Sequence, residues 1–335
     1  MALGEQGMKS HIICFAVPLL LMSNMAEAKP AAKTLRAVAP TNTELTAPGP
    51  SGPLGAVLLQ HDDVEPLILI IPGSGPTDRD GNNPLGVTSA SYRLLAQALS
   101  AQNVATLRID KRGMFGSKAA TPDANKVSIA DYVSDVHAWV KTLQAKTKRK
   151  CVWLLGHSEG SLVALAAAQK QAGICGVISV AGGGRKLGAV MREQFTQNPA
   201  NAPILPDALR VIDELEAGRR VEVNKMHPAL QGMFAPQVQG FFIDLFAQDP
   251  AALAAALKLP ILIAQGDHDL QVKVADAQAL AIAQPKAKLL IVPGMTHVLK
   301  QVADDTPAAN FATYSDVNAP VSKLLVDGIA QFVKR

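Results

Sequence analysis

The chain alternates between short apolar runs and longer stretches in which apolar residues recur every three or four positions. The short runs predict strands at 54–59, 66–71, 104–110, 151–155, 175–180, 261–264 and 289–292. The helical spacing predicts helices at 89–101, 129–143, 158–171, 274–282 and 321–333. Strands that alternate with helices are typical of a mostly parallel sheet covered by helices on both faces. The pattern therefore predicts an α/β fold.

The alternation is interrupted between residues 185 and 258, where helical segments and prolines occur without a convincing strand. An insertion between two strands is expected to form a cap over the carboxyl ends of the sheet, where ligands bind in α/β proteins. We therefore predict a core in two parts, 51–184 and 259–335, separated by a helical cap at 185–258. Five apolar cap residues are candidates either for lining a substrate pocket or for packing the cap: Phe234, Phe241, Phe242, Leu245 and Phe246.

The N-terminal residues have the pattern of a secretory signal peptide. Lys9 precedes an apolar run at 12–22, and the small-x-small sequence Ala26-Glu27-Ala28 follows it. The apolar run is too short to span a bilayer. We therefore expect cleavage after Ala28, export to the periplasm or the medium, and no membrane anchor afterwards. Residues 29–50, rich in alanine, proline and threonine, are expected to form a flexible lead-in.

The composition of the chain limits the classes of partner and cofactor that we expect. The net charge is +4 over 335 residues, and aromatic residues make up only 4%, which argues against a nucleic-acid partner. Cys151 and Cys175 remain after signal cleavage, and each begins an apolar, strand-like run. They are expected either to pair, if the strands are neighbours in an oxidising compartment, or to stay inert buried thiols. The cysteines and histidines form no zinc motif, so we expect neither a metal nor an organic cofactor.

A candidate nucleophile lies between a predicted strand and a predicted helix. Ser158 is the centre of a Gly-x-Ser-x-Gly sequence flanked by Gly156 and Gly160. A nucleophile elbow requires this strand–turn–helix arrangement. The glycines relieve crowding around a strained serine, and the helix N-terminus favours developing negative charge. Ser158 is therefore predicted to be a nucleophile.

A serine hydroxyl needs a base to take its proton and an acid to orient that base, in the chain order serine, acid, histidine. His297 follows the last predicted strand and is the predicted base. The preceding strand leads into Asp267 and Asp269. We favour Asp269 as the acid, with Asp267 as a carboxylate that caps the loop.

An oxyanion hole needs two backbone amides. The first is expected from Glu159, directly after the nucleophile. The second is expected from Ser74, in a loop where Gly73 and Gly75 let the backbone approach a substrate. An ordinary Gly-Pro turn is the alternative for this loop.

With these residues in place, the chain resembles the α/β-hydrolase superfamily over most of residues 54–335. The elbow at 156–160 is similar to the family's G-x-S-x-G, and residues 266–272 are similar to its G-x-x-D-x-x-V acid loop, which supports Asp269. The stretches 75–82 and 110–113 are similar to a bacterial carboxylesterase subgroup described as serine aminopeptidase-like or dienelactone hydrolase-like.

The resemblance implies a serine hydrolase, most simply a carboxylesterase acting on small acyl esters without a cofactor. An aminopeptidase or amidase with the same residues is the first alternative, and a non-catalytic binding protein that kept the fold is the second. Ion pairs of Asp78, Arg79, Asp80 and Arg112 are expected to support the loops, and Asp110 is expected to support a loop as well. Two features depart from the family: Pro72 replaces a histidine, and Met114-Phe115 lengthens a loop where it is expected to alter substrate fit.

Overall fold

A computed structural model describes residues 39–61, 66–147, 149–304 and 306–335 of the chain. The predicted signal peptide at 1–28 lies outside these residues. Among the helices described, none combines the length and the apolar character needed to cross a bilayer.

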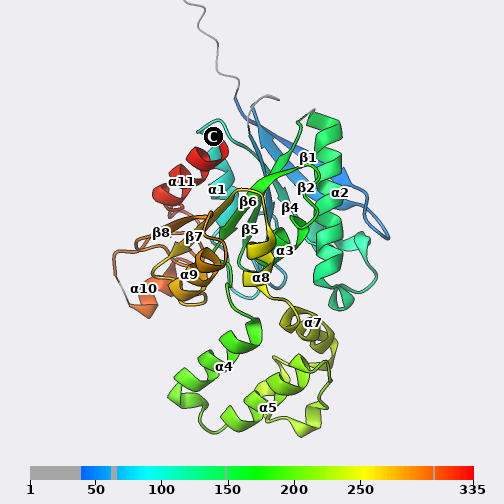
Figure 1. Ribbon diagram of the computed structural model, residues 1–335, viewed down its shortest axis with the longest axis vertical. Helices are drawn as coiled ribbons and strands as arrows, with labels where there is room; N and C mark the ends of the chain where they lie inside the picture. The colour runs from blue at the N-terminus through cyan, green and yellow to red at the C-terminus, as the bar shows by residue number, and fades with distance from the viewer. Residues whose placement is uncertain (1–38, 62–65, 148, 305) are drawn as a thin grey trace, which may run out of the picture. The chain divides into compact units, whose positions relative to one another are not determined.

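An eight-stranded sheet forms the centre of the fold (Figure 1). Its strands are β1 Thr41–Ala47, β2 Leu54–Gln60, β3 Leu67–Ile71, β4 Ala105–Ile109, β5 Val152–His157, β6 Ile174–Val180, β7 Ile261–Gly266 and β8 Lys288–Val292. The strand order is β1-β2-β4-β3-β5-β6-β7-β8. β2 pairs antiparallel with β1 and β4, whereas the pairs from β4 to β8 are parallel. The predicted, mostly parallel α/β sheet is therefore confirmed.

The predicted flexible lead-in at 29–50 is wrong for residues 41–47. These residues form the edge strand β1, which pairs in register with all seven residues of β2. Most β1 side chains are exposed, so the segment lacks the apolar pattern that marked the other strands. Its backbone hydrogen bonds to β2 define it as a strand, and these do not require an apolar side chain.

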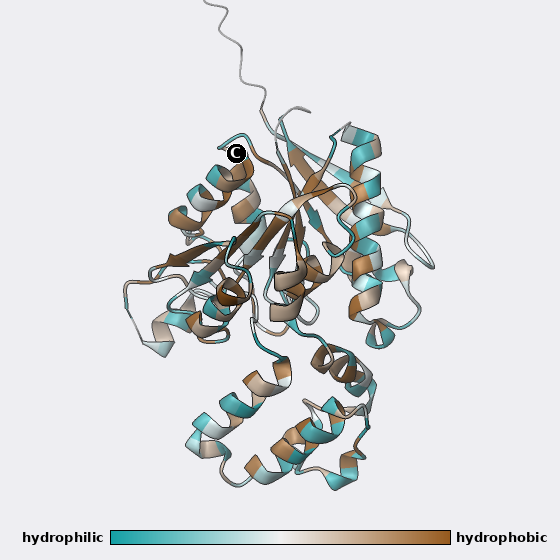
Figure 2. Ribbon diagram, viewed as in Figure 1, coloured by the Kyte–Doolittle hydropathy of each residue, from teal (hydrophilic) through white to brown (hydrophobic). Residues whose placement is uncertain are grey.

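Helices cover both faces of the sheet because the central strands bury side chains on both sides. In β3, Leu69 packs into the cluster beneath α2 Ile129–Thr147, α3 Glu159–Ala167 and α9 Val274–Ala283. Its neighbour Ile70 packs into the opposite cluster, beneath α1 Ser91–Ser100 and α11 Lys323–Val333. Figure 2 shows the central strands as largely apolar and the outer helices as mixed. Strands that are buried on both faces have nearly continuous apolar sequences.

The segment between β6 and β7 is helical, as predicted. It contains α4 Leu187–Gln197, α5 Leu205–Glu216, α6 Pro228–Gln231, α7 Pro236–Phe246 and α8 Pro250–Ala256. Helices α4 to α7 share their own apolar cluster, which includes Val211, Leu215 and Phe234. In contrast, α8 places Ala254 in the core cluster and contacts α3 and α9. The cap cluster therefore ends before α8.

The remaining helical elements are short. They are α10 Pro307–Ala312 and the 3-10 helices Phe115–Ala120, Ala124–Lys126, Pro199–Asn201 and Val223–Lys225.

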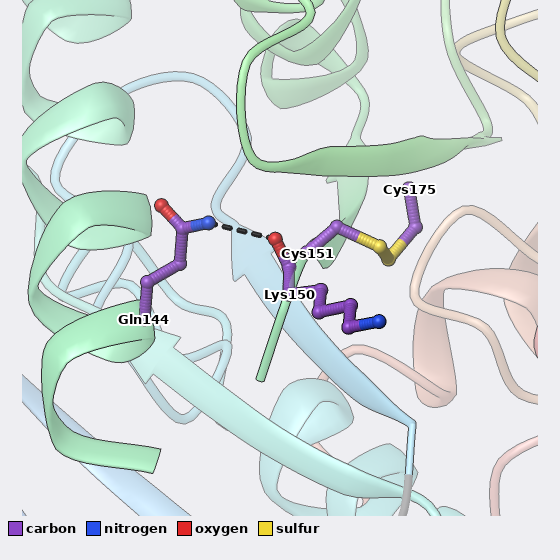
Figure 3. The surroundings of a disulfide bond; sticks show 4 residues. All are labelled: Gln144, Lys150, Cys151 and Cys175. Carbon is purple, nitrogen blue, oxygen red and sulfur yellow. Dashed lines mark hydrogen bonds between the residues drawn. A yellow bond between two sulfur atoms is a disulfide. The ribbon is translucent and has the colours of Figure 1, made fainter. Parts of the chain in front are cut away.

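Cys151 and Cys175 form a disulfide, with their Cα atoms 5.2 Å apart (Figure 3). The alternative of two buried thiols is therefore wrong. The β5–β6 register shifts between Val152 and Trp153, which leaves Cys175 as the extra residue opposite the start of β5. The bond joins the amino ends of two neighbouring strands, whereas Ser158 follows the carboxyl end of β5.

Candidate active site

Ser158 occupies a strained turn between β5 and α3. Its backbone has φ 53° and ψ −121°, a conformation that few non-glycine residues adopt. A Cβ atom at Gly160 would lie 2.3 Å from the carbonyl oxygen of Ile71 and 2.6 Å from that of Pro72. The α3 N-terminus therefore packs against the end of β3 at a distance that only glycine permits.

Asp269 and His297 form a buried pair at the carboxyl edge of the sheet. His297 Nδ1 lies 2.8 Å from Asp269 Oδ2, and the exposed fractions of the two side chains are 7% and 0%. Burial by itself raises the pKa of Asp269, but the charge and hydrogen bond of His297, with the amides of Gln271 and Val272, lower it below its ordinary value. Asp269 is therefore held as a carboxylate beside His297.

Asp267 has a different environment. Its Oδ1 accepts a hydrogen bond from the backbone N–H of Gly294 at 2.7 Å, and its side chain is 41% exposed. It ties the loop after β7 to the loop after β8. This geometry is that of a loop-capping carboxylate and leaves Asp269 as the acid that contacts His297.

The loop after β3 lies directly against Ser158. A Cβ atom at Gly73 would be 3.2 Å from Ser158 Cβ and 3.4 Å from His157 Nδ1. The next residue, Ser74, lines both cavities that Ser158 lines. Glu159 is the first residue of α3. The predicted oxyanion residues, Ser74 and Glu159, therefore lie on the two segments that flank the serine.

A chain of hydrogen bonds links three loops of the site. The Gly73 N–H donates to the Tyr92 hydroxyl at 3.0 Å, and that hydroxyl lies 2.8 Å from His157 Nδ1. His157 Nε2 lies 2.8 Å from the carbonyl oxygen of His297. A carbonyl oxygen only accepts, so His157 carries its proton on Nε2, and Tyr92 donates to Nδ1. Both ring nitrogens of His157 are thus engaged.

Sequence reasoning did not assign roles to three residues that hold this site. Tyr92 lies on the buried face of α1, where an aromatic residue is ordinary core. Lys111 follows β4 and is almost fully buried. Gln265 lies inside β7 and donates from Nε2 to Asp269 Oδ2 at 3.1 Å. For Lys111 and Gln265, the available signal was a polar residue just after, or within, a buried strand.

Two cavities meet at Ser158. The smaller one, about 250 Å³, includes His157, His297, Tyr92 and Tyr314 in its wall. The larger one, about 400 Å³, extends between the core and the helical segment. Its apolar wall consists of Leu162, Leu187, Val190, Leu245, Pro250, Leu270 and Val272.

The five apolar candidates of the cap divide between the two expected roles. Leu245 lines the larger cavity. Phe234, Phe242 and Phe246 pack in the cap cluster, and Phe241 packs edge-on against Tyr132 of the core. Met114 and Phe115 are not among the described residues that line either cavity, and the expectation that they alter substrate fit stays a prediction.

Ion pairs of Arg79, Asp80 and Arg112 support the surrounding loops, as predicted, whereas Asp78 forms hydrogen bonds. The fully buried carboxylate of Asp110 accepts from the Arg79 side chain at 2.6 Å, and Asp80 pairs with Arg108. Arg112 pairs with Asp135 of α2 at 2.6 Å. The Asp78 carboxylate accepts hydrogen bonds from backbone amides of its own loop.

Comparisons with known proteins found a matching family and a sequence relative. Residues 85–301 match the family described as serine aminopeptidase, S33. Esterase EstD of Thermotoga maritima is 27% identical over 265 residues, which are 76% of this chain and 57% of that protein. The chain thus spans little more than half of that relative.

Solved structures share the fold. Est1E of Butyrivibrio proteoclasticus, solved with ferulic acid bound, has a TM-score of 0.55 at 16% identity, covering 87% of this chain and 98% of that one. A bromoperoxidase from Bacillus anthracis has a TM-score of 0.52 at 16% identity, covering 88% and 100%. These likenesses confirm the α/β-hydrolase fold.

Proposed function

We propose, from the premise that the chain belongs to the serine aminopeptidase S33 family of α/β hydrolases, that it is a serine carboxylesterase that cleaves small acyl esters. One observation carries the proposal. His297, which is paired with the buried Asp269, lines the same cavity as Ser158, whose backbone is held in the strained conformation of an elbow. The name of the Thermotoga maritima relative supports an ester substrate.

In the first step, His297 takes the Ser158 proton as the hydroxyl oxygen attacks the ester carbonyl. Asp269 keeps the His297 proton on Nδ1, so that Nε2 is free to act as the base, and stabilises the imidazolium that forms. The Ser74 and Glu159 amides stabilise the oxyanion, each contributing about 3–4 kcal/mol. The imidazolium then protonates the leaving alcohol, and an acyl-serine remains.

In the second step, His297 removes a proton from water, and the resulting hydroxide attacks the acyl-serine. The same two amides stabilise the second oxyanion. Collapse of this intermediate breaks the acyl–oxygen bond, releases the carboxylic acid and returns the proton to Ser158.

The charges around the site favour a neutral ester over a peptide with a charged terminus. In the larger cavity, Arg185 is paired with Asp276 at 2.9 Å and with Glu193. Glu159 is paired with Lys111. The described wall of the smaller cavity includes no aspartate, glutamate, lysine or arginine. A peptide terminus entering either cavity would therefore compete with an existing ion pair or lose its hydration, at a cost that an uncharged acyl group avoids.

We also propose that the protein is exported. The signal-peptide pattern at 1–28 supports this, as does the disulfide, since such bonds persist in oxidising compartments. N-terminal sequencing of protein from the periplasm or the medium should start at Lys29. Full-length chain confined to the cytoplasm would contradict the export proposal.

Covalent labelling tests the nucleophile. A fluorophosphonate probe should label the wild type at Ser158, located by peptide mass spectrometry, and should not label Ser158→Ala. Ser161→Ala is the matched control, because Ser161 lies one turn along α3 and bonds to Ser179. An unlabelled wild type would contradict the hydrolase proposal.

Substrate kinetics test the bond that is cleaved. The kcat/KM for p-nitrophenyl esters of short acyl chains should exceed that for aminoacyl p-nitroanilides. The reverse order would favour the aminopeptidase alternative.

A further inference from the structure

Lys111 is a buried lysine whose ammonium lies between the two segments of the proposed oxyanion hole. Its Nζ donates to the Gly73 carbonyl oxygen at 2.7 Å and lies 3.3 Å from Glu159 Oε1. Both charged side chains are 4% exposed. The ammonium also lies 5.4 Å from the centre of the Tyr132 ring. Burying an ammonium is costly unless its partners offset the lost hydration, so these contacts define one position for it.

The contact with Gly73 fixes the orientation of the Ser74 amide. The Gly73 carbonyl and the Ser74 N–H belong to the same peptide group, which is planar and, in its usual trans form, points the two in opposite directions. Lys111 holds the carbonyl oxygen, so the Ser74 N–H points away from Lys111. On the preceding peptide, Tyr92 holds the Gly73 N–H. Gly73 is thus restrained through both of its polar backbone atoms.

The same contact makes the Ser74 amide a stronger donor. A positive charge on a carbonyl oxygen draws electron density across the peptide group, which increases the positive charge on the attached N–H. Hydrogen bonds in series strengthen one another in this way inside proteins.

The contact with Glu159 links Lys111 to the residue that supplies the second donor of the proposed oxyanion hole. Glu159 is the first residue of α3, and its backbone N–H is the other proposed oxyanion contact. Lys111 binds the side chain of this residue and the carbonyl preceding Ser74 with one ammonium. One ammonium group therefore joins the two donor segments.

We propose that Lys111 is a positioning residue that sets the orientation and spacing of the Ser74 and Glu159 amides, and so supports oxyanion stabilisation without contacting the substrate. This rests on the proposed function. Its neighbour Arg112 provides a comparison, because it also forms a buried ion pair, but with Asp135 of α2. If buried charge pairs only hold the fold together, the two residues should behave alike.

The test is the rate of phosphonylation of Ser158 by a fluorophosphonate, measured per competent site. The labelled fraction at completion counts the competent enzyme, and the rate constant reports the chemical step. In Lys111→Met we expect the rate constant and the kcat for a p-nitrophenyl ester to fall about 10- to 100-fold. This is less than the about 100- to 1,000-fold loss on removing a donor outright. KM should change little.

Lys111→Met leaves the Glu159 carboxylate buried without its partner, so the double variant Lys111→Met/Glu159→Gln is measured beside it. This variant removes both charges and keeps both shapes, and the same fall in rate constant is expected. The control Arg112→Met should lower the labelled fraction or the melting temperature and leave the rate constant per competent site unchanged.

A wild-type rate constant in both Lys111 variants would overturn the positioning role. A fall in the labelled fraction alone would also overturn it, since that is the result of a purely structural role. Failure of the wild type to label at all would overturn the proposed function itself and is recognisable without any variant.

Discussion

The Nε2 atom of His157 lies 2.8 Å from the main-chain carbonyl oxygen of His297, so the residue before the proposed nucleophile holds the backbone of the proposed base. Burial, together with the nearby charge of His297, lowers the pKa of His157 to about 3. His157 is therefore neutral in the folded protein at neutral pH. Burial also raises the pKa of Tyr92, which keeps the Tyr92 hydroxyl available to donate.

The first prediction concerns acid stability. Between pH 6.5 and about 3, the unfolded chain carries a proton on His157 that the folded protein lacks. The free energy of unfolding should therefore fall as the pH falls through this range, by at most about 1.4 kcal/mol per pH unit. Asp269 contributes little to this pH dependence above its ordinary pKa of 3.8. Because its pKa is lowered in the folded protein, its protonation reduces the free energy of unfolding only below that pH.

The measurement is urea unfolding of wild type and His157→Asn between pH 4 and 6.5, where the variant should show the shallower slope. His227→Asn is the control, because His227 is exposed and caps α6 in a position that asparagine also suits. Equal slopes for wild type and His157→Asn would contradict the prediction.

The second prediction separates the two aspartates. Asp269→Asn should lower kcat about 1,000- to 10,000-fold, because an amide stabilises neither the required tautomer nor the imidazolium. Asp267→Asn should keep kcat within a few-fold, because asparagine still offers an oxygen to the Gly294 N–H. Steady-state ester hydrolysis measures both. The opposite ranking would move the acid to Asp267.

The third prediction concerns the packing of the elbow. Gly160→Ala should lower stability by about 1–3 kcal/mol or more, because the added methyl group meets the Ile71 and Pro72 carbonyl oxygens and no flexible side chain there can move aside. It should also lower kcat, because the clash is relieved only if α3 moves away from the loop after β3, which contains Ser74. Thermal unfolding and ester kinetics measure the two effects.

Gly232→Ala is the matched control, because it has right-handed helical backbone angles and nothing lies within 4 Å of its added Cβ. It should be neutral, or stabilising by up to about 1 kcal/mol. Equal behaviour of the two variants would show that the close contact at Gly160 is relieved at no cost.

The fourth prediction concerns the disulfide. Cys151→Ser/Cys175→Ser should lower the free energy of unfolding by about 3 kcal/mol, because the bond closes a loop with a sequence separation of 24. The kcat should be unchanged, since the bond lies at the opposite ends of β5 and β6 from Ser158. A large loss of kcat in fully folded double variant would contradict this separation of roles.

Much of the core was predictable because its signals are local. Apolar runs located β2 to β8 within one or two residues, since strands buried on both faces need apolar side chains throughout. The exposed β1 was missed for the same reason. The order of Ser158, Asp269 and His297 at strand ends followed from turn residues that sit beside them in the sequence.

The sequence by itself determined the fold class, the elbow serine and the histidine of the candidate triad, and limited the acid to Asp267 or Asp269, because periodicity and glycine spacing act over a few residues. Only the tertiary structure decided that Cys151 pairs with Cys175, that Asp269 rather than Asp267 contacts His297, and that Lys111 bridges Gly73 and Glu159. These contacts join residues 24 to 48 positions apart. A buried charge takes its partners from whichever strands the sheet places beside it, and strand order is a property of the assembled sheet.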